Sequence, residues 1–345
     1  MKTIFLTIIG LLFSVTTTFS SEEITPYKYT DQEREKGLEP YDIPEKSRFT
    51  IKRRKVNAPN IVCYMSKPNK PSFPIAILCG GSSSKNDITS IIHFHRYFLK
   101  EFLDLGVAVL TVEQRGIDGK KIDPQEFMTH YTRSERLHDH QAVVEYLKLH
   151  PPKGWNGKFI FLGVSEGGPI VTELTTQYSK RTIATINWSG AGDWSWRDEL
   201  WAFIEGMKRD IPSYIKWRMF IPKWFPFSID LYLPKTREEY DAAMDKTLAN
   251  PSYKKELMGM TYTYHADALT YHGHDYSQIR TPFLVVAGAK DTIIESSDAF
   301  VEKAKRAGAP ITYLRISDMD HYVRKRPEVV QQSFDWLKKQ INLNP

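Results

Sequence analysis

The chain has 345 residues, of which 41% are hydrophobic and 26% charged. This composition is typical of a soluble globular protein that is long enough to bury a full core. The net charge of +6 at pH 7 is spread along the chain, which argues against dedicated nucleic-acid binding.

Residues 1–20 have the features of a secretory signal peptide. Lys2 precedes an apolar run at 4–13, and Thr18-Phe19-Ser20 has small residues at positions −3 and −1 of a cleavage site. The run is too short to span a bilayer comfortably. A lipoprotein anchor is not expected, because there is no cysteine near the cleavage point. We therefore expect a secreted or periplasmic protein, in which residues 21–48 form a polar N-terminal arm.

The rest of the chain alternates short apolar runs with helical patterns. Residues 49–56 predict a strand with one exposed face, which pairs with 61–65. Buried strands are predicted at 75–79, 107–112, 159–162, 182–188, 283–288 and 311–316, and helices at 88–105, 134–149 (with Ser134 as its cap), 296–307 and 327–341. This alternation predicts an α/β fold: a mainly parallel sheet with helices on both faces.

The two cysteines, Cys63 and Cys79, both fall in predicted strands. An exported protein could join them in a disulfide, but the two strands need not be neighbours in the sheet. We favour two buried free thiols.

The sequence Gly163-Val164-Ser165-Glu166-Gly167 lies between a predicted buried strand and a helical pattern. Strand, tight turn and helix form the context in which a G-x-S-x-G motif holds a serine nucleophile. Gly163 and Gly167 lack a Cβ, so the strand and the helix can approach each other closely. The start of the helix would place N–H groups beside a developing oxyanion. This pattern predicts that Ser165 is a nucleophile.

A serine nucleophile needs a base and a carboxylate that orients the base. Asp291 follows the strand at 283–288, and His321 follows the strand at 311–316. Both therefore lie at the carboxyl ends of strands, where open α/β sheets carry their sites. Asp193, after the strand at 182–188, is the alternative acid.

The order Ser165, Asp291, His321 and its context resemble the α/β-hydrolase superfamily over about residues 46–342. Glu113-Gln114-Arg115-Gly116 is similar to the Asp-x-Arg-Gly found in many members. The resemblance implies an oxyanion hole formed by the backbone N–H groups of Glu166 and Gly81, with Ser82 as an alternative to Gly81. This chain has Cys79-Gly80-Gly81 where the family often has His-Gly before its oxyanion residue.

The resemblance also implies how the chain is divided. Residues 49–193 and 279–345 would form the hydrolase core, and 194–278 would form a cap inserted between the sixth and seventh core strands. The insertion is rich in aromatic residues, including Trp217 and Trp224. These aromatic residues either form a hydrophobic core within the cap or form one wall of a pocket for an acyl substrate. Contact of the cap with a membrane interface is a further interpretation.

Three His-x-His pairs raise the question of a metal, namely His93/His95, His138/His140 and His272/His274. Residues i and i+2 of a helix point about 200° apart, so the first two pairs cannot face one ion. The third pair lies in a predicted loop without an evident third ligand. We expect no metal and no cofactor.

These features predict a secreted serine hydrolase that cleaves an ester, a thioester or a related acyl bond through an acyl-enzyme. Its partner would be a small acyl substrate or a short peptide, and not a nucleic acid; the sequence leaves the oligomeric state open. A serine peptidase of the same fold, similar to the prolyl oligopeptidases, is the first alternative, although no propeller domain precedes the core. A non-catalytic binding protein on this fold is the second alternative.

Overall fold

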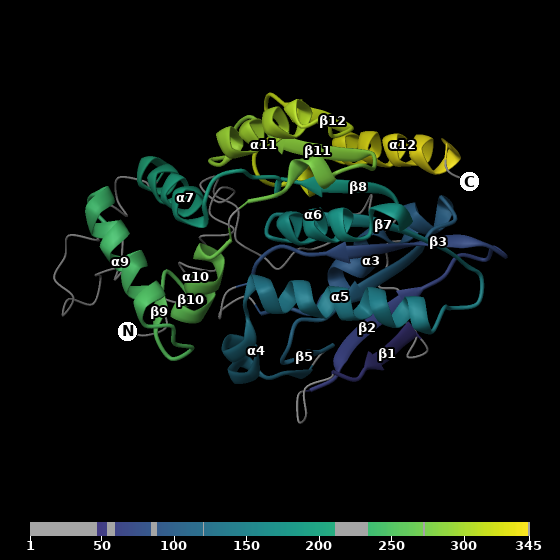
Figure 1. Cartoon of the computed structure of the whole chain (residues 1–345), viewed down its shortest axis with the longest axis horizontal. Coiled ribbons are helices and arrows are strands. Elements are labelled where there is room, and N and C mark those ends of the chain that lie inside the picture. The colour runs from purple at the N-terminus through teal and green to yellow at the C-terminus, as the bar shows by residue number, and fades with distance from the viewer. Residues whose placement is uncertain are drawn as a thin grey trace. The chain divides into compact units, whose positions relative to one another are not determined.

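The computed structural model describes residues 47–53, 59–83, 88–119, 121–210, 234–271 and 273–343 (Figure 1). The predicted signal peptide, nearly all of the predicted arm, Trp217 and Trp224 lie outside these residues. The chain divides into two compact units. The core unit takes its residues from Lys28–Ser82, Thr89–Asp193 and His274–Pro345, and the inserted unit takes its described residues mainly from Trp194–Gly273.

An eight-stranded sheet forms the centre of the core unit, in the order β1-β2-β4-β3-β7-β8-β11-β12. The strands are β1 (Arg48–Ile51), β2 (Ile61–Ser66), β3 (Phe73–Cys79), β4 (Ala108–Val112), β7 (Trp155–Val164), β8 (Thr182–Trp188), β11 (Phe283–Gly288) and β12 (Ile311–Ile316). The six strands from β4 to β12 are parallel to one another, whereas β1 and β2 are antiparallel to their neighbours. The mainly parallel sheet predicted from the sequence is confirmed.

Helices cover both faces of this sheet (Figure 1). Ala76 and Leu78 of β3 pack in a cluster with α3 (Ile92–Asp104) and α12 (Pro327–Leu343). Ile75 and Ile77 of the same strand pack with α5 (Arg133–Leu149) and α6 (Gly167–Gln177). Alternate residues of a strand point to opposite faces, so β3 needs apolar side chains at every position. This requirement explains the uninterrupted apolar run in the sequence.

The remaining elements of the core unit are short, apart from α11 (Ile294–Arg306), which packs on Phe283 and Val285 of β11. They are β5 (Ile117–Asp118), β6 (Lys121–Ile122), α4 (Pro124–His130) and the 3-10 turns η4 (Ser179–Arg181), η5 (Tyr276–Gln278) and η6 (Val323–Lys325).

Several predicted boundaries are wrong, among them the following three. The first strand ends at Ile51, because Arg53 leaves the ladder for a buried ion pair with Asp139 at 2.6 Å. Helix α5 begins at Arg133, not at Ser134, because the Thr132 side chain accepts a hydrogen bond from the backbone N–H of Glu135. Helix α3 begins at Ile92 instead of 88.

Both cysteines are buried and free. Cys63 is on β2 and Cys79 is on β3, and β4 lies between these two strands. The prediction of two free thiols is confirmed.

The inserted unit has a small core of its own. Its described elements are α7 (Trp196–Asp210), α9 (Arg237–Ala249), β9 (Glu256–Leu257), β10 (Met260–Thr261) and α10 (Tyr262–Leu269). Leu200, Ile204, Tyr240 and Met244 form a buried cluster, on which Trp196 and Trp201 pack. Trp196 and Trp201 thus pack internally, as the first of the two interpretations expects. Among the described residues, no helix has the length and apolar character that a membrane crossing requires.

A buried histidine in the core unit predicts a pH-dependent stability. His95 is fully buried, and its ring nitrogens lie 3.0 Å from Ser66 Oγ and 2.9 Å from Thr111 Oγ1. Burial, together with the charge of Arg96, lowers the pKa of His95 to about 3. The unfolded chain protonates this side chain near pH 6.5. Between these two pH values the unfolded state binds more protons than the folded state. The free energy of unfolding is therefore highest above about pH 6.5 and falls as the pH decreases.

We expect this one histidine to lower the free energy of unfolding by about 2 kcal/mol between pH 7.5 and pH 5. Urea unfolding of the wild type and of His95→Gln at both pH values measures the effect. We expect His95→Gln to be less stable than the wild type at pH 7.5, but to lose less unfolding free energy than the wild type when the pH is lowered to 5. Equal losses in both proteins would contradict the assignment.

Candidate active site

Ser165 occupies a sharp turn between β7 and α6. Its φ is +51°, a left-handed conformation that residues with a Cβ rarely adopt. The Ser165 N–H donates to Trp188 O at 2.9 Å, and the Gly168 N–H donates to Ser165 O at 2.8 Å. These bonds tie the turn to β8 on one side and to the first turn of α6 on the other, so the backbone strain is maintained by its surroundings.

The glycines around Ser165 are required by close backbone approach. A Cβ on Gly163 would lie 2.5 Å from Gly167 O, and a Cβ on Gly167 would lie 2.2 Å from Cys79 O. Real Cβ atoms essentially never come this close to other atoms. The start of α6 therefore packs directly on the ends of β7 and β3, as the sequence pattern predicts for a nucleophile-bearing turn.

Asp291 and His321 lie in two loops that follow β11 and β12. The Lys290 N–H donates to Met319 O at 3.0 Å, which joins the two loops. His321 Nδ1 donates to Asp291 Oδ2 at 2.6 Å, and His321 Nε2 lies 3.0 Å from Ser165 Oγ. The Asp291 side chain is 5% exposed. The structure thus brings together the three residues that the sequence analysis selected as nucleophile, base and acid.

This geometry is suitable for nucleophilic attack. An imidazole whose Nδ1–H is held by a buried carboxylate presents its unprotonated Nε2 to the serine hydroxyl. Such a nitrogen can accept the hydroxyl proton while the oxygen attacks a carbonyl carbon.

Asp193, the alternative acid, has other partners. Its carboxylate accepts from Tyr276 Oη at 2.5 Å and pairs with Lys303 Nζ at 2.6 Å. The Asp193 N–H also bonds to Ser296 at the start of α11. Asp291, and not Asp193, is therefore the carboxylate that contacts His321.

The two residues expected to form an oxyanion hole lie beside Ser165. A Cβ built on Gly81 would be 3.3 Å from Ser165 Cβ and 3.9 Å from its Oγ. Glu166 follows Ser165 directly and is the N-cap residue of α6. N–H groups in the first turn of a helix have no acceptor within that helix, so they suit an anion. The predicted wall residues Trp217 and Trp224 lie outside the described residues.

A buried polar network beneath this turn was missed by the sequence analysis. The guanidinium of Arg136 bonds to the Glu166 carboxylate at 2.7 Å and to Gly80 O at 2.6 Å. Tyr131 Oη donates to the same Glu166 oxygen at 2.6 Å. The sequence does carry a signal: Arg136 and His140 are spaced with Val143 and Leu147 along one buried stripe of α5. Two ionisable residues on such a stripe indicate a buried polar site.

Two histidines of the His-x-His pairs, His140 and His274, have structural partners. His140 Nδ1 donates to Arg136 O at 2.7 Å, and His274 Nδ1 lies 3.0 Å from Glu173. In the described part of the chain, no group of three His, Cys, Asp or Glu side chains is arranged to hold a metal ion.

The covered parallel sheet, with Ser165, Asp291 and His321 at the carboxyl ends of its strands, defines the class: the protein is a hydrolase of the α/β-hydrolase superfamily. Residues 90–321, about two thirds of the chain, match a family described as serine aminopeptidase, S33. The chain belongs to this family.

Solved structures with low sequence identity share the fold. The α/β-hydrolase domain-containing protein 10 from mouse is 17% identical with a TM-score of 0.52, covering 87% of this chain and 100% of the mouse chain. Est1E from Butyrivibrio proteoclasticus with bound ferulic acid is 19% identical with a TM-score of 0.51, covering 82% of this chain and 96% of that one. A putative dipeptidyl aminopeptidase IV from Bacteroides ovatus is 14% identical with a TM-score of 0.53; the match covers 86% of this chain but 35% of that one.

A search of curated proteins found no match.

The packing at the serine turn gives a testable prediction. Gly167→Ala places a methyl group against the backbone of Cys79, which cannot move without displacing β3. We expect a loss of about 3 kcal/mol in unfolding free energy, at the upper end for overpacked sites. Gly308→Ala is the control, because its Cβ would meet nothing within 4 Å and only its φ of +79° is unfavourable, at about 1 kcal/mol. Urea unfolding of both variants measures the difference, and equal losses would refute this account of the turn.

Proposed function

We propose that the protein is a secreted serine hydrolase that cleaves an ester, a thioester or a related acyl bond. The observation that carries this proposal is the continuous hydrogen-bonded chain from Ser165 Oγ to His321 to Asp291, at 3.0 and 2.6 Å. Secretion is inferred from residues 1–20 alone. The N-terminal sequence of protein exported by a host cell tests it, since removal of the signal peptide leaves Ser21 or a near neighbour as the first residue.

In the proposed reaction, His321 removes the proton of the Ser165 hydroxyl as Ser165 Oγ attacks the acyl carbonyl. Asp291 holds the imidazole tautomer and stabilises the imidazolium that forms. The N–H groups of Gly81 and Glu166 bind the oxyanion of the tetrahedral intermediate. The imidazolium then protonates the leaving group, and water, activated by His321, releases the acyl group from Ser165.

Substitutions of these residues test the proposal. Ser165→Ala and His321→Ala should each reduce kcat by about 10⁶-fold, and the double variant should be scarcely worse, because such residues act as a unit. Asp291→Asn should be milder, at about 10⁴-fold, since the carboxylate contacts His321 and not the substrate.

Asp193→Asn is the matched control, since it removes a carboxylate from an equivalent position after the neighbouring strand. It should retain kcat close to that of the wild type. Loss of turnover in Asp193→Asn with full activity in Asp291→Asn would reverse the assignment of the acid. A Ser165→Ala variant with wild-type activity would end the proposal.

A peptidase activity is the second candidate, favoured by the family to which the chain belongs, which is described as serine aminopeptidase. A panel of p-nitrophenyl esters of graded acyl length, measured beside aminoacyl arylamides, separates the two. We expect higher kcat/KM for the esters. A preference for the arylamides that Ser165→Ala abolishes would make the protein a peptidase with the same catalytic residues.

A further inference from the structure

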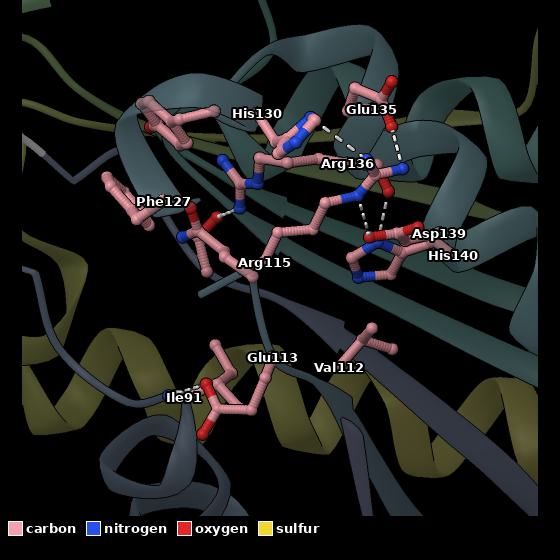
Figure 2. Close-up of a pocket in the computed structure, with 13 residues that line it drawn as sticks. Ile91, Val112, Glu113, Arg115, Phe127, His130, Glu135, Arg136, Asp139 and His140 are labelled. Carbon is pink, nitrogen blue, oxygen red and sulfur yellow. Dashed lines mark hydrogen bonds and ion pairs between the residues drawn. The ribbon is translucent and has the colours of Figure 1, made fainter. Parts of the chain in front are cut away.

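Arg136 is a buried charged residue of the core unit to which the proposed reaction assigns no role. It lies on α5, it is 6% exposed, and it lines a polar pocket together with Arg115, Asp139 and His140 (Figure 2). Burying a charge in this way is costly unless the charge is paired and hydrogen-bonded. The partners of Arg136 therefore indicate what the buried charge is for.

The first partner is the peptide that carries one proposed oxyanion donor. Arg136 Nη2 donates to Gly80 O at 2.6 Å. The carbonyl of Gly80 and the N–H of Gly81 belong to the same planar trans peptide, in which these two groups point in opposite directions. By holding the carbonyl, Arg136 turns the Gly81 N–H away from itself. Gly81 has its Cα beside Ser165, as the 3.3 Å approach of a built Cβ shows.

The second partner is the residue that carries the other proposed donor. Arg136 Nη1 donates to Glu166 Oε2 at 2.7 Å, and the Tyr131 hydroxyl donates to the same oxygen at 2.6 Å. Glu166 is 7% exposed. A side chain fixed at its far end restricts the backbone of its own residue, which has φ −56° and ψ −20° at the start of α6.

One rigid group therefore joins both donors. The two contacts use different nitrogens of a planar guanidinium, whose N–H groups form a fixed fork. We propose that Arg136 positions the oxyanion hole, by holding the Gly80–Gly81 peptide and the Glu166 side chain at a constant separation. This inference rests on the proposed function, since it assigns the task of Arg136 within the same reaction.

The pocket supplies a matched control. Arg115 lines the same pocket, is similarly buried and pairs with Glu135 on α5, with its Nη1 3.1 Å from His130 Nδ1 (Figure 2). None of these partners belongs to the peptides beside Ser165. Arg115→Met thus removes a buried arginine and its ion pair without removing a bond to either proposed donor.

The readout is a pair of substrates, a p-nitrophenyl ester and the matching thionoester, in which C=S replaces C=O. Sulfur accepts hydrogen bonds weakly, so an intact oxyanion hole favours the oxygen ester. Arg136→Met should lower kcat for the ester by about 100-fold, with KM little changed, and should lower kcat for the thionoester much less. The ester-to-thionoester ratio therefore falls in Arg136→Met, whereas Arg115→Met keeps the wild-type ratio.

A second variant separates positioning from stability. Arg136→Met removes the ion pair between Arg136 and the buried Glu166 carboxylate, which by itself destabilises the fold. The double variant Arg136→Met/Glu166→Gln removes both charges and so regains thermal stability, but Gly80 O still lacks its donor. We expect the double variant to melt near the wild-type temperature and to keep the low substrate ratio.

Three outcomes would decide against these ideas. If Arg136→Met keeps the wild-type ester-to-thionoester ratio, the inference about Arg136 is wrong but the proposed function stands. The same holds for a double variant that recovers both stability and ratio, because Arg136 would then only neutralise Glu166. Wild-type protein that neither cleaves the ester nor reacts with a fluorophosphonate probe overturns the proposed function, and the inference with it.

Discussion

The left-handed conformation of Ser165 is the constraint around which the carboxyl edge of the sheet is built. A backbone of this kind costs about 1–3 kcal/mol and persists only where neighbouring segments hold it. Here β8 accepts the Ser165 N–H, α6 donates to the Ser165 carbonyl, and Gly167 packs on the carbonyl of Cys79. Three strands and one helix thus meet at a single residue. Any displacement of β3 or β8 at this edge changes the direction in which the hydroxyl points.

The electrostatic arrangement beneath the turn follows from the same packing. Close approach of β3 to α6 leaves the Gly80 carbonyl and the Glu166 side chain in a region that water does not reach freely, and both need partners there. Helix α5 supplies them through Arg136, while Tyr131, just before that helix, also donates to Glu166. A cation, a carboxylate and a peptide dipole therefore balance one another next to the turn.

How far the sequence predicts this structure depends on the kind of interaction. The buried strands and Gly163-x-Ser165-x-Gly167 could be read directly, because apolar periodicity and missing Cβ atoms are local properties. The positions of Asp291 and His321 followed from the rule that parallel strands end at one edge. Helix ends were less predictable. Both Thr132 and Ser134 are good N-cap residues for α5, and which of them is used depends on which backbone N–H groups the fold leaves without partners. Arg136 could not be assigned a task, because its partners lie 30 and 56 residues away along the chain.

The joining of β8 to β11 has a kinetic consequence. Thr185 and Phe283 are neighbours in the sheet, yet Trp194–Gly273, the main part of the inserted unit, lies between them in the chain. The entropy lost on closing a loop grows only with the logarithm of its length, so an insertion at this point changes equilibrium stability little. Pairing of strands distant in sequence is nevertheless slow. On renaturation, we therefore expect β3, β7, α6 and β8, which together hold the Ser165 turn, to assemble before the last two strands bring in the loops that bear Asp291 and His321. The expected order of assembly is thus the serine turn first, and the acid and the base afterwards.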